Sequence, residues 1–308
     1  MSAFFAKSRQ PDVAAVRARR KATPRTLGAW GLRISLYVSM LVVLVLILAP
    51  FAWLVISSVA SQADLITVPL KWIPEHASLD RLAALILGST TNDAAIGFRA
   101  AIVNSLVVVS STTAIAMVTG VIAAYAFARL HFPGRNYLIY IFLATYMLPP
   151  IAIILPIYEF LSGFGLLDTR IALIVVYSSF VTPFVIWLMR GYFEHISTEL
   201  DDAARVDGCS RLGALWRVIL PVSLPGLFST TVLAFLLCWD EFFYALILTQ
   251  TNESKTLPIA INDFIGRHSV DFGMLAAGGL IAALPPVLIA FVFQRYIVSG
   301  LTAGGVKG

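Results

Sequence analysis

Charged residues are scarce in this sequence, and that scarcity excludes most classes of soluble protein. Asp, Glu, Lys and Arg make up 13% of the 308 residues, whereas 59% are hydrophobic. Soluble domains carry about 25% charged residues, so the composition predicts an integral membrane protein. The basic residues cluster near the amino terminus and at a few joints, a pattern that does not indicate a nucleic-acid binder despite the net charge of +5.

The sequence also lacks the motifs of catalytic, redox and metal sites. Its two cysteines, Cys209 and Cys238, are too few for a disulfide framework, and neither has a zinc-type partner spacing. His195 and Glu199 share helical spacing, but a pair without a third ligand is typical of a solvated surface. A G-x-x-x-x-G-K-[ST] phosphate loop does not occur, so the sequence carries no such nucleotide-binding motif. We therefore predict no catalytic residue, cofactor or metal on this chain.

Long runs without charge are the dominant feature of what is present. About 20 apolar residues are enough to cross a bilayer core. One such run could be a buried core helix, but six of them leave too little polar chain to wrap a soluble core. We therefore predict six transmembrane helices within residues 33–300. The runs lie between the charged residues at 33 and 64, 99 and 129, 135 and 159, 170 and 190, 217 and 240, and 271 and 295.

The distribution of Lys and Arg predicts which side of the membrane each segment faces. Sixteen of the 22 basic residues fall on the side of the amino terminus, and cytoplasmic loops carry the excess. Both termini are therefore expected in the cytoplasm, with residues 301–308 as the C-terminal tail. The run at 34–59 is too long for a cleaved signal. Residues 1–32 are predicted as a basic cytoplasmic tail, either a topology determinant or a segment attracted to anionic lipid.

Prolines are expected to interrupt two of the spans. Pro149, Pro150 and Pro156 lie in the third run, and Pro285 with Pro286 lies in the sixth. Helix-breaking residues are tolerated in a bilayer where neighbouring protein or a water-filled cavity satisfies the freed backbone groups. These helices are therefore expected either to line a cavity or to be kinked against a neighbour.

The largest cytoplasmic loop, 194–221, reads EHISTELDDAARVDGCSRLGALWRVILP and has the pattern of two short amphipathic helices. Apolar residues repeat at helical spacing in both halves. Gly208 is suited to end the first helix and Ser210 to cap the second. The predicted apolar faces are Ile196, Leu200, Ala203 and Ala204 in the first helix, and Leu212, Leu215, Trp216 and Ile219 in the second.

Small residues in the first half of the loop allow another backbone to approach closely. Ala203, Ala204 and Gly208 form this patch, and charged side chains surround it. Two interpretations follow from the residues alone. The loop is either a docking surface for another protein or a helix pair that lies on the bilayer surface.

Three strings in this loop resemble a known motif. Asp202-Ala203-Ala204, Asp207-Gly208 and Ile219-Leu220-Pro221 resemble the EAA loop of permease subunits in binding-protein-dependent ABC importers. This sequence departs from the usual pattern at three positions. Asp202 stands where that family usually has Glu, Cys209 where Ala is typical, and Leu215 where an aromatic residue is common.

Two further segments extend the resemblance toward the carboxyl terminus. Trp239-Asp240-Glu241-Phe242, with Ala245-Leu246, is similar to the fifth helix of sugar-importer permeases. The end of the chain is similar to the tail of the smaller permease in the maltose-importer group. That similarity lies in Phe293-Gln294-Arg295-Tyr296, Gly300-Leu301-Thr302-Ala303-Gly304 and Val306-Lys307-Gly308.

The resemblance implies an all-α integral membrane protein with type I ABC importer permease architecture, six transmembrane helices and a cytoplasmic coupling-helix loop. It implies a second, homologous permease, two cytoplasmic ATPase subunits that bind ATP and Mg, an extracytoplasmic substrate-binding protein and a place in the bacterial cytoplasmic membrane. The chain would then be a permease without enzymatic activity that moves a sugar or oligosaccharide by alternating access. The residues implied to dock on the ATPase are Asp202, Ala203, Ala204, Asp207, Gly208, Leu212, Trp216, Leu220 and Pro221.

Two acids near the end of the fifth run are candidates for the translocation pathway. Acids inside a span are costly and usually functional. If the helix starts near Pro225, a rise of about 1.5 Å per residue places Asp240 about 22 Å from its start. One acid of the pair Asp240 and Glu241 is expected to face the cavity or brace its outer gate, with a plain scaffold role as the alternative. Trp239 and Tyr244 beside them either stack on a sugar or pack within the span.

The outer segment 251–272 carries polar residues of a type that could contact the extracytoplasmic binding protein, as the corresponding loop does in the maltose-importer group. A solvated connector is the other interpretation. Two alternatives to a sugar permease also stay open: a permease for another polar solute such as glycerol phosphate, and an ion-coupled secondary transporter. The latter usually needs internal inverted repeats and more spans. An intramembrane enzyme would need a catalytic constellation beyond Asp240 and Glu241.

Overall fold

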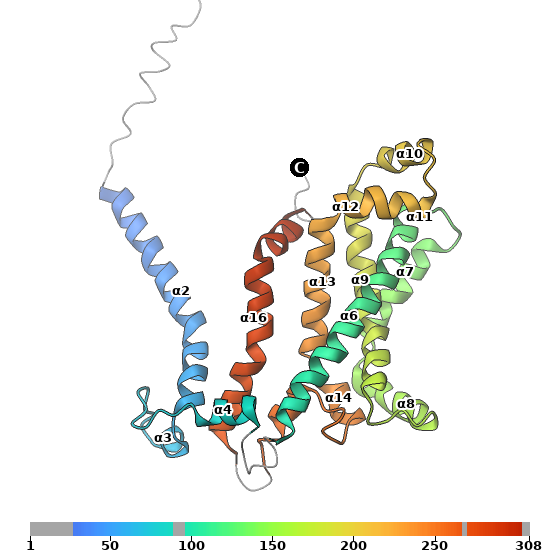
Figure 1. The fold of residues 1–308 in the computed structure, drawn as a ribbon. Helices are drawn as coiled ribbons and strands as arrows, with labels where there is room; N and C mark the ends of the chain where they lie inside the picture. The colour runs from blue at the N-terminus through green and yellow to red at the C-terminus, as the bar shows by residue number, and fades with distance from the viewer. Residues whose placement is uncertain (1–26, 89–95, 267–269, 304–308) are drawn as a thin grey trace, which may run out of the picture. The chain divides into compact units, whose positions relative to one another are not determined.

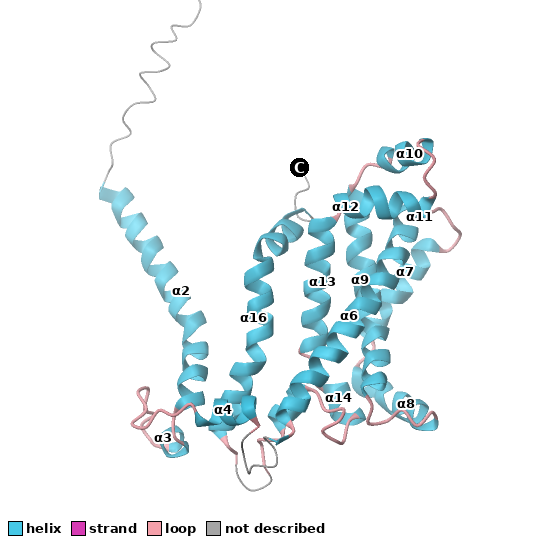
Figure 2. Cartoon of the chain, viewed as in Figure 1, coloured by secondary structure: helices cyan, strands magenta, loops and turns pink. Residues whose placement is uncertain are grey.

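The computed structural model describes residues 27–88, 96–266 and 270–303. Within these residues helices joined by loops are the regular secondary structure, apart from one isolated bridge between Ile265 and Val270 (Figures 1 and 2). The contacts divide the chain into two units, 1–53 and 54–308. The predicted tails at 1–32 and 301–308 lie largely outside the described residues, and the predicted domain limits stay predictions.

The helices keep the labels of Figure 1. In chain order they are α2 (Leu27–Val59), α3 (Gln62–Ile66), α4 (Asp80–Leu87), α6 (Phe98–Arg129), α7 (Arg135–Ala144), the 3₁₀ turn η1 (Thr145–Met147), α8 (Pro150–Gly163), α9 (Arg170–His195), α10 (Glu199–Val206), α11 (Arg211–Ala214), the π-helical turn η2 (Leu215–Ile219), α12 (Leu220–Val222), α13 (Leu224–Trp239), α14 (Phe243–Leu248), α15 (Leu257–Asn262) and α16 (Phe272–Ala303).

The apolar runs predicted to cross the membrane are present as helices, but two of them are not straight. Four stretches are long and apolar enough to span alone: 32–59, 98–129, 170–195 and 272–294. The third run bends by 97° between 135–147 and 150–163, and the fifth by 85° between 211–222 and 224–239. Counting each bent pair as one span gives six. The prediction of six apolar segments is confirmed, and so is the expected interruption of the third run near Pro149 and Pro150, whereas the bend that precedes α13 in the fifth was not predicted.

Prolines account for both bends. Leu148 and Pro149 each precede a proline and are extended, with ψ of 119° and 131°, because the proline ring disfavours a helical conformation in the residue before it. Pro150 then occupies the first turn of α8, where its missing N–H costs nothing. In the fifth run Pro225 similarly opens α13 after the break at Ser223. Pro156, by contrast, lies inside α8 and does not end it.

The predicted interruption of the sixth span is wrong, because α16 continues as one helix through Pro285 and Pro286. Pro286 has no N–H to donate to the carbonyl of Ala282, four residues earlier. The Trp239 indole Nε1–H of α13 donates to that carbonyl at 3.1 Å. A side chain of the neighbouring helix thus satisfies the freed backbone group, and the helix does not break.

The core of the second unit lies where α6, α9 and α13 pack together (Figure 1). Helices α6 and α9 approach closely at Gly120, where an added Cβ would lie 2.6 Å from Val185 Cγ1. Tyr177 and Phe193 of α9 are fully buried in this core. Helices α10, α11 and α12 lie at one end of the bundle and α4, α8 and α14 at the other (Figure 1). We call these the α10 end and the α14 end.

Candidate functional site

The loop at the α10 end contains the two short helical segments that its sequence predicts. Gly208 has φ of +86°, the left-handed conformation that ends α10. The Ser210 hydroxyl accepts a hydrogen bond from the Gly213 N–H at 3.1 Å and caps α11. The second segment is continuous from Arg211 to Val222, and its middle turn, η2, is π-helical. The bend at Ser223 then leads into α13.

The apolar face predicted for the first helix is found only in part. Ile196 lies outside α10, and the side chains of Leu200 and Ala203 are exposed. The bundle instead buries Ala204 and the carboxylate-bearing Asp201, which is only 8% exposed. His195 and Glu199 do not lie on one helix, although their spacing would allow it. Helix α9 ends at His195, and α10 begins at Glu199.

Asp201 is buried because the end of α6 provides partners for its charge. The Asp201 Oδ2 lies 2.8 Å from Arg129 Nε, and its Oδ1 accepts a hydrogen bond from the Tyr125 hydroxyl at 2.6 Å. Arg129 also donates to the carbonyl of Ile196 at 2.7 Å. We call Tyr125, Arg129 and Asp201 the α6–α10 latch. Sequence reasoning missed it, because no spacing or motif in the sequence indicates that Asp201 is buried against α6.

The residues implied to dock on an ATPase separate into an exposed set and a buried set. Ala204 and Leu220 are buried and help to hold the loop together. The exposed set also has a neighbour that the sequence did not single out, because Val206 is 87% exposed at the end of α10. The exposed members are Asp202, Ala203, Asp207, Gly208, Leu212, Trp216 and Pro221.

Trp216 lies on a different surface from the exposed residues of α10. Leu215 and Ile219 are fully buried, whereas Trp216 and Leu212 are more than half exposed. Trp216 lines an apolar groove of about 450 Å³ that runs between α6, α12 and α13. The groove is lined by Ser110, Thr113, Ala114, Met117, Val118, Val121, Trp216, Leu220, Leu227, Thr231 and Phe235.

The four pathway candidates near the end of α13 lie in two different environments. Trp239 and Tyr244 are buried, and Tyr244 stacks on Phe180 with ring centroids 5.9 Å apart. Glu241 accepts hydrogen bonds from the backbone N–H of Tyr244 at 2.8 Å, so it caps the start of α14. Asp240, by contrast, is exposed. Their roles in transport stay predictions.

The loop after α14 is held to the bundle by a dense set of hydrogen bonds around Asp168. Asp168 has φ of +58°, and its carboxylate accepts from the backbone N–H groups of Gln250 and Thr251 at 2.8 and 3.0 Å and from the Ser254 hydroxyl. Burial alone would raise the pKa of this carboxyl. The three donors outweigh burial and lower the pKa of Asp168 to about 2.

Two residues at the start of α6 fix the same loop from another side. The Asn104 amide donates to the carbonyls of Asn252 and Lys255 at 3.1 and 2.8 Å. The Ser105 hydroxyl accepts from the Leu257 N–H at 2.7 Å. The exposed tip between these contacts is 250–253. Whether this tip meets a binding protein stays a prediction.

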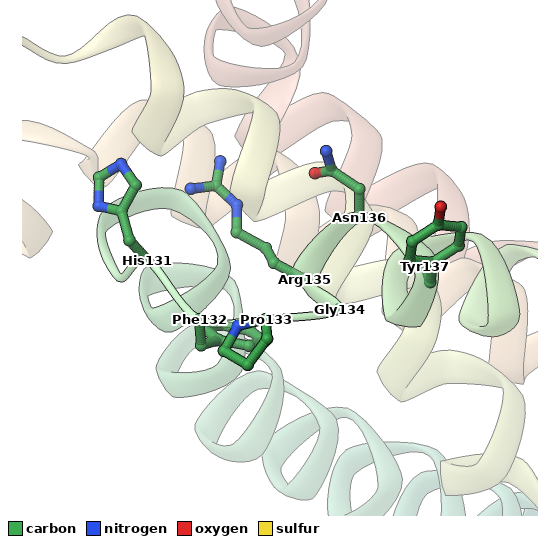
Figure 3. A pocket seen from close by; sticks show the side chains of 7 residues that line it. All are labelled: His131, Phe132, Pro133, Gly134, Arg135, Asn136 and Tyr137. Carbon is green, nitrogen blue, oxygen red and sulfur yellow. The ribbon is translucent and has the colours of Figure 1, made fainter.

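A surface pocket with a volume of about 610 Å³ lies along the connection between α6 and α7, at the α10 end. Figure 3 shows the side chains of His131, Arg135 and Asn136 on the same side of this connection. The Arg135 guanidinium lies 3.6 Å from Glu194, which also pairs with Arg190. The residues that line this pocket include none from α10.

Sequence comparison places the chain among transport proteins. A sequence profile of the binding-protein-dependent transport system inner membrane component family matches residues 116–303. The trehalose/maltose transport system permease protein of Thermococcus litoralis is 33% identical over 90% of this chain and 97% of its own length. The trehalose transport system permease protein of Mycobacterium tuberculosis is 36% identical over 77% of this chain and 85% of its own length.

The fold has a counterpart among solved structures. A bacterial ABC transporter involved in the import of the acidic polysaccharide alginate has a chain that superposes with a TM-score of 0.73. The superposition covers 89% of this chain and 99% of that chain, at 21% identity. At that identity the likeness concerns the fold alone.

Proposed function

Because the chain belongs to the family of binding-protein-dependent transport system inner membrane components, we propose that it is the permease subunit of an ATP-driven importer of saccharides. The profile match over residues 116–303 carries this conclusion, since it includes the loop at the α10 end and both bent spans. An ion-coupled secondary transporter is not supported by this family assignment.

The subunit works in an assembly whose other members supply what this chain lacks. A second, homologous permease completes the solute path, and two ATPase subunits bind ATP and Mg. An extracytoplasmic binding protein delivers the solute. The chain itself performs no chemistry, in keeping with a sequence that contains no phosphate-binding loop.

The α10 end is the cytoplasmic end in this proposal, and both termini lie in the cytoplasm. The excess of Lys and Arg on that side supports the orientation. The exposed residues of α10 and α11 then face the ATPase, with Asp202 and Ala203 on the first helix and Leu212 on the second. Closure of the ATPase pair moves this loop and switches the path between its two openings.

The proposed cargo is a saccharide, because the named relatives transport saccharides or their derivatives. Besides the two trehalose permeases, a sulfoquinovosyl glycerol permease of Agrobacterium fabrum is 31% identical over 85% of this chain and 89% of its own length. Glycerol phosphate is therefore not the favoured solute. Within the path, the exposed carboxylate of Asp240 is the candidate for contact with sugar hydroxyls, while Glu241 holds α14 in place.

Transport by the purified assembly tests this proposal. The chain is reconstituted in proteoliposomes with its second permease, its ATPase subunits and its binding protein, and radiolabelled trehalose and maltose serve as probes. Uptake is expected to require both ATP and the binding protein. Uptake driven by an ion gradient without ATP hydrolysis would refute the proposal, and so would the failure of the chain to copurify with an ATPase subunit.

The docking role of the loop is tested by a bulky substitution on its exposed face. Ala203→Trp places a large ring where a small side chain is exposed, and it should abolish copurification of the ATPase. Thr198→Trp is the matched control, because Thr198 is exposed in the same loop, precedes α10 and makes no side-chain capping hydrogen bond to it. Equal effects of the two substitutions would contradict docking through α10.

A further inference from the structure

Asp201 is the one acid of α10 that the bundle buries, and all of α10 lies within the described chain. Glu199 and Asp202, the other two acids of the helix, are exposed. The Asp201 carboxylate therefore points toward the bundle, whereas Asp202, Ala203 and Val206 lie on exposed parts of the helix. The helix has an outer face for a partner and an inner face fixed by a charge.

The charges in the α6–α10 latch are shielded from water. The side chains of Arg129 and Asp201 are 8% and 11% exposed. A buried ion pair contributes little net stability compared with an apolar contact of similar volume, but removal of one partner leaves an uncompensated buried charge. An apolar contact would be enough merely to attach α10. The ion pair adds a geometric constraint, because the guanidinium of Arg129 and the carboxylate of Asp201 must stay close together.

The latch joins three elements at one point. Tyr125 and Arg129 are one turn apart at the end of α6, Ile196 caps the end of α9, and Asp201 belongs to α10. Arg129 contacts both the carboxylate of Asp201 and the carbonyl of Ile196. Short connections at 196–198 and 207–210 join α10 to its neighbours in the chain, and α10 also packs against α11 and η2, but Asp201 is its charged attachment to α6.

Helix α6 is well placed to carry a movement away from the latch. Gly120 allows α6 to approach α9 closely, at Val185, and α6 also contacts α13. At its other end, Asn104 and Ser105 bind the loop at 252–257. A displacement applied to α10 therefore reaches both the core and the α14 end through one continuous helix.

We propose that Tyr125, Arg129 and Asp201 make α10 and α6 move as one body, so that the ATPase drives α6 directly when it displaces the coupling loop. This rests on the proposed function. The three are positioning residues, because none of them lies on the exposed face of α10. Without the latch, α10 would keep its contacts with α11 and η2 but would lose its direct attachment to α6, and its displacement would no longer be passed to α6 at this point.

Distance measurements on the assembled transporter test whether α10 and α6 move together. Spin labels are attached at Thr198→Cys and Ile122→Cys, two exposed positions on the loop and on α6, after Cys209→Ser and Cys238→Ala. The distance between the labels is measured without nucleotide and after trapping with ATP and vanadate. With the latch intact, the distance is expected to be the same in both states.

A neutral double variant removes the latch without leaving a lone buried charge. In Arg129→Gln/Asp201→Asn, the trapped and nucleotide-free distances should differ, while ATP hydrolysis persists. Arg129→Lys keeps the charge and should restore the fixed distance. Glu199→Gln is the matched control, because it removes an exposed charge from the same helix and should leave the distance fixed.

The outcomes separate the latch from the function on which it rests. In the protein with an intact latch, a spin-label distance that changes on trapping would overturn the latch. Continued ATP hydrolysis in the same sample would show that the transporter itself works. A spin-label distance that stays fixed in the neutral double variant would also overturn the latch. The three residues would then serve only to stabilise the fold. An assembly without ATP hydrolysis overturns the proposed function and the latch together.

Discussion

Helix α6 holds a loop at each of its ends, and the two attachments use different chemistry. At the α10 end, one ion pair and one hydroxyl bind Asp201. At the α14 end, Asn104 and Ser105 bind backbone groups of the loop at 252–257, and Asp168 adds three more hydrogen bonds. The attachment at the α10 end depends mainly on one ion pair, so we call it concentrated. The attachment at the α14 end depends on several hydrogen bonds from neutral donors, so we call it distributed.

This difference predicts how each loop responds to damage. A concentrated attachment fails when one partner is lost, because the other charge stays buried. A distributed attachment loses about 1 kcal/mol for each hydrogen bond removed and keeps its geometry. We therefore expect the α10 loop to be sensitive to single substitutions and the α14 loop to tolerate them.

The largest effect is expected from Arg129→Ala. It leaves the Asp201 carboxylate buried without its partner, which should destabilise the protein by about 3–5 kcal/mol. The matched control is Arg190→Ala, since Arg190 forms an ion pair of similar length with Glu194 but in a more exposed position, worth less than about 1 kcal/mol. Thermal unfolding of the assembled transporter in detergent measures both. Equal shifts in the two variants would mean that the α10 loop does not depend on the burial of this charge, and that its attachment is not concentrated in the Arg129–Asp201 pair.

A smaller loss of folding stability is expected from Asn104→Leu at the opposite end of α6. The substitution removes the donor to the carbonyls of Asn252 and Lys255 and should cost about 1–3 kcal/mol. Hydrogen exchange of the 249–257 segment should speed up while the rest of the bundle keeps its protection. Thr119→Val is the control, since it removes an exposed hydroxyl that donates within its own helix. Global unfolding of Asn104→Leu would show that the attachment is not distributed.

The third prediction concerns pH. The native pKa of Asp168, about 2, lies below its ordinary value of about 3.9. The stabilisation is therefore present above about pH 4 and is lost as the pH falls toward 2. Because this carboxyl is partly exposed, solvent screening reduces the effect to about 1 kcal/mol.

Asp168→Asn isolates this charge, because Asn also tolerates the left-handed backbone conformation of this position. The difference in unfolding temperature between the native protein and the variant should be larger at pH 5 than at pH 3. A difference that does not depend on pH would mean that the carboxylate charge contributes nothing to holding the loop.

Much of the fold could be predicted from the sequence, because composition and local signals determine it. Six uncharged runs predict six apolar helical segments, and Gly208 and Ser210 mark the ends of the two loop helices correctly. The sequence also contains the family motif at Asp202-Ala203-Ala204. These features depend on residues close together in the chain, where spacing alone is informative.

The rest could not be predicted, because it depends on contacts between distant residues. Asp201 and Tyr125 are 76 positions apart, so an amphipathic pattern could not show that a carboxylate belongs to the buried face. Pro286 was expected to interrupt α16, and the Trp239 indole that compensates for it lies 43 positions from Ala282. Trp239, which makes this contact, is buried. From the sequence it was only a candidate for the translocation pathway.

The smallest expected effect tests burial directly, by comparing two ion pairs of nearly equal length. Lys255 Nζ lies 2.7 Å from Asp263 Oδ2 in the α14 loop, close to the 2.8 Å of Arg129 and Asp201, but these side chains are 20% and 35% exposed. Lys255→Gln should therefore cost only about 0.2–1 kcal/mol. High salt should abolish this cost, because salt screens exposed charges and affects buried pairs much less. A cost that persists in 1 M salt, as expected for Arg129→Ala, would mean that length and not burial sets the strength of these pairs.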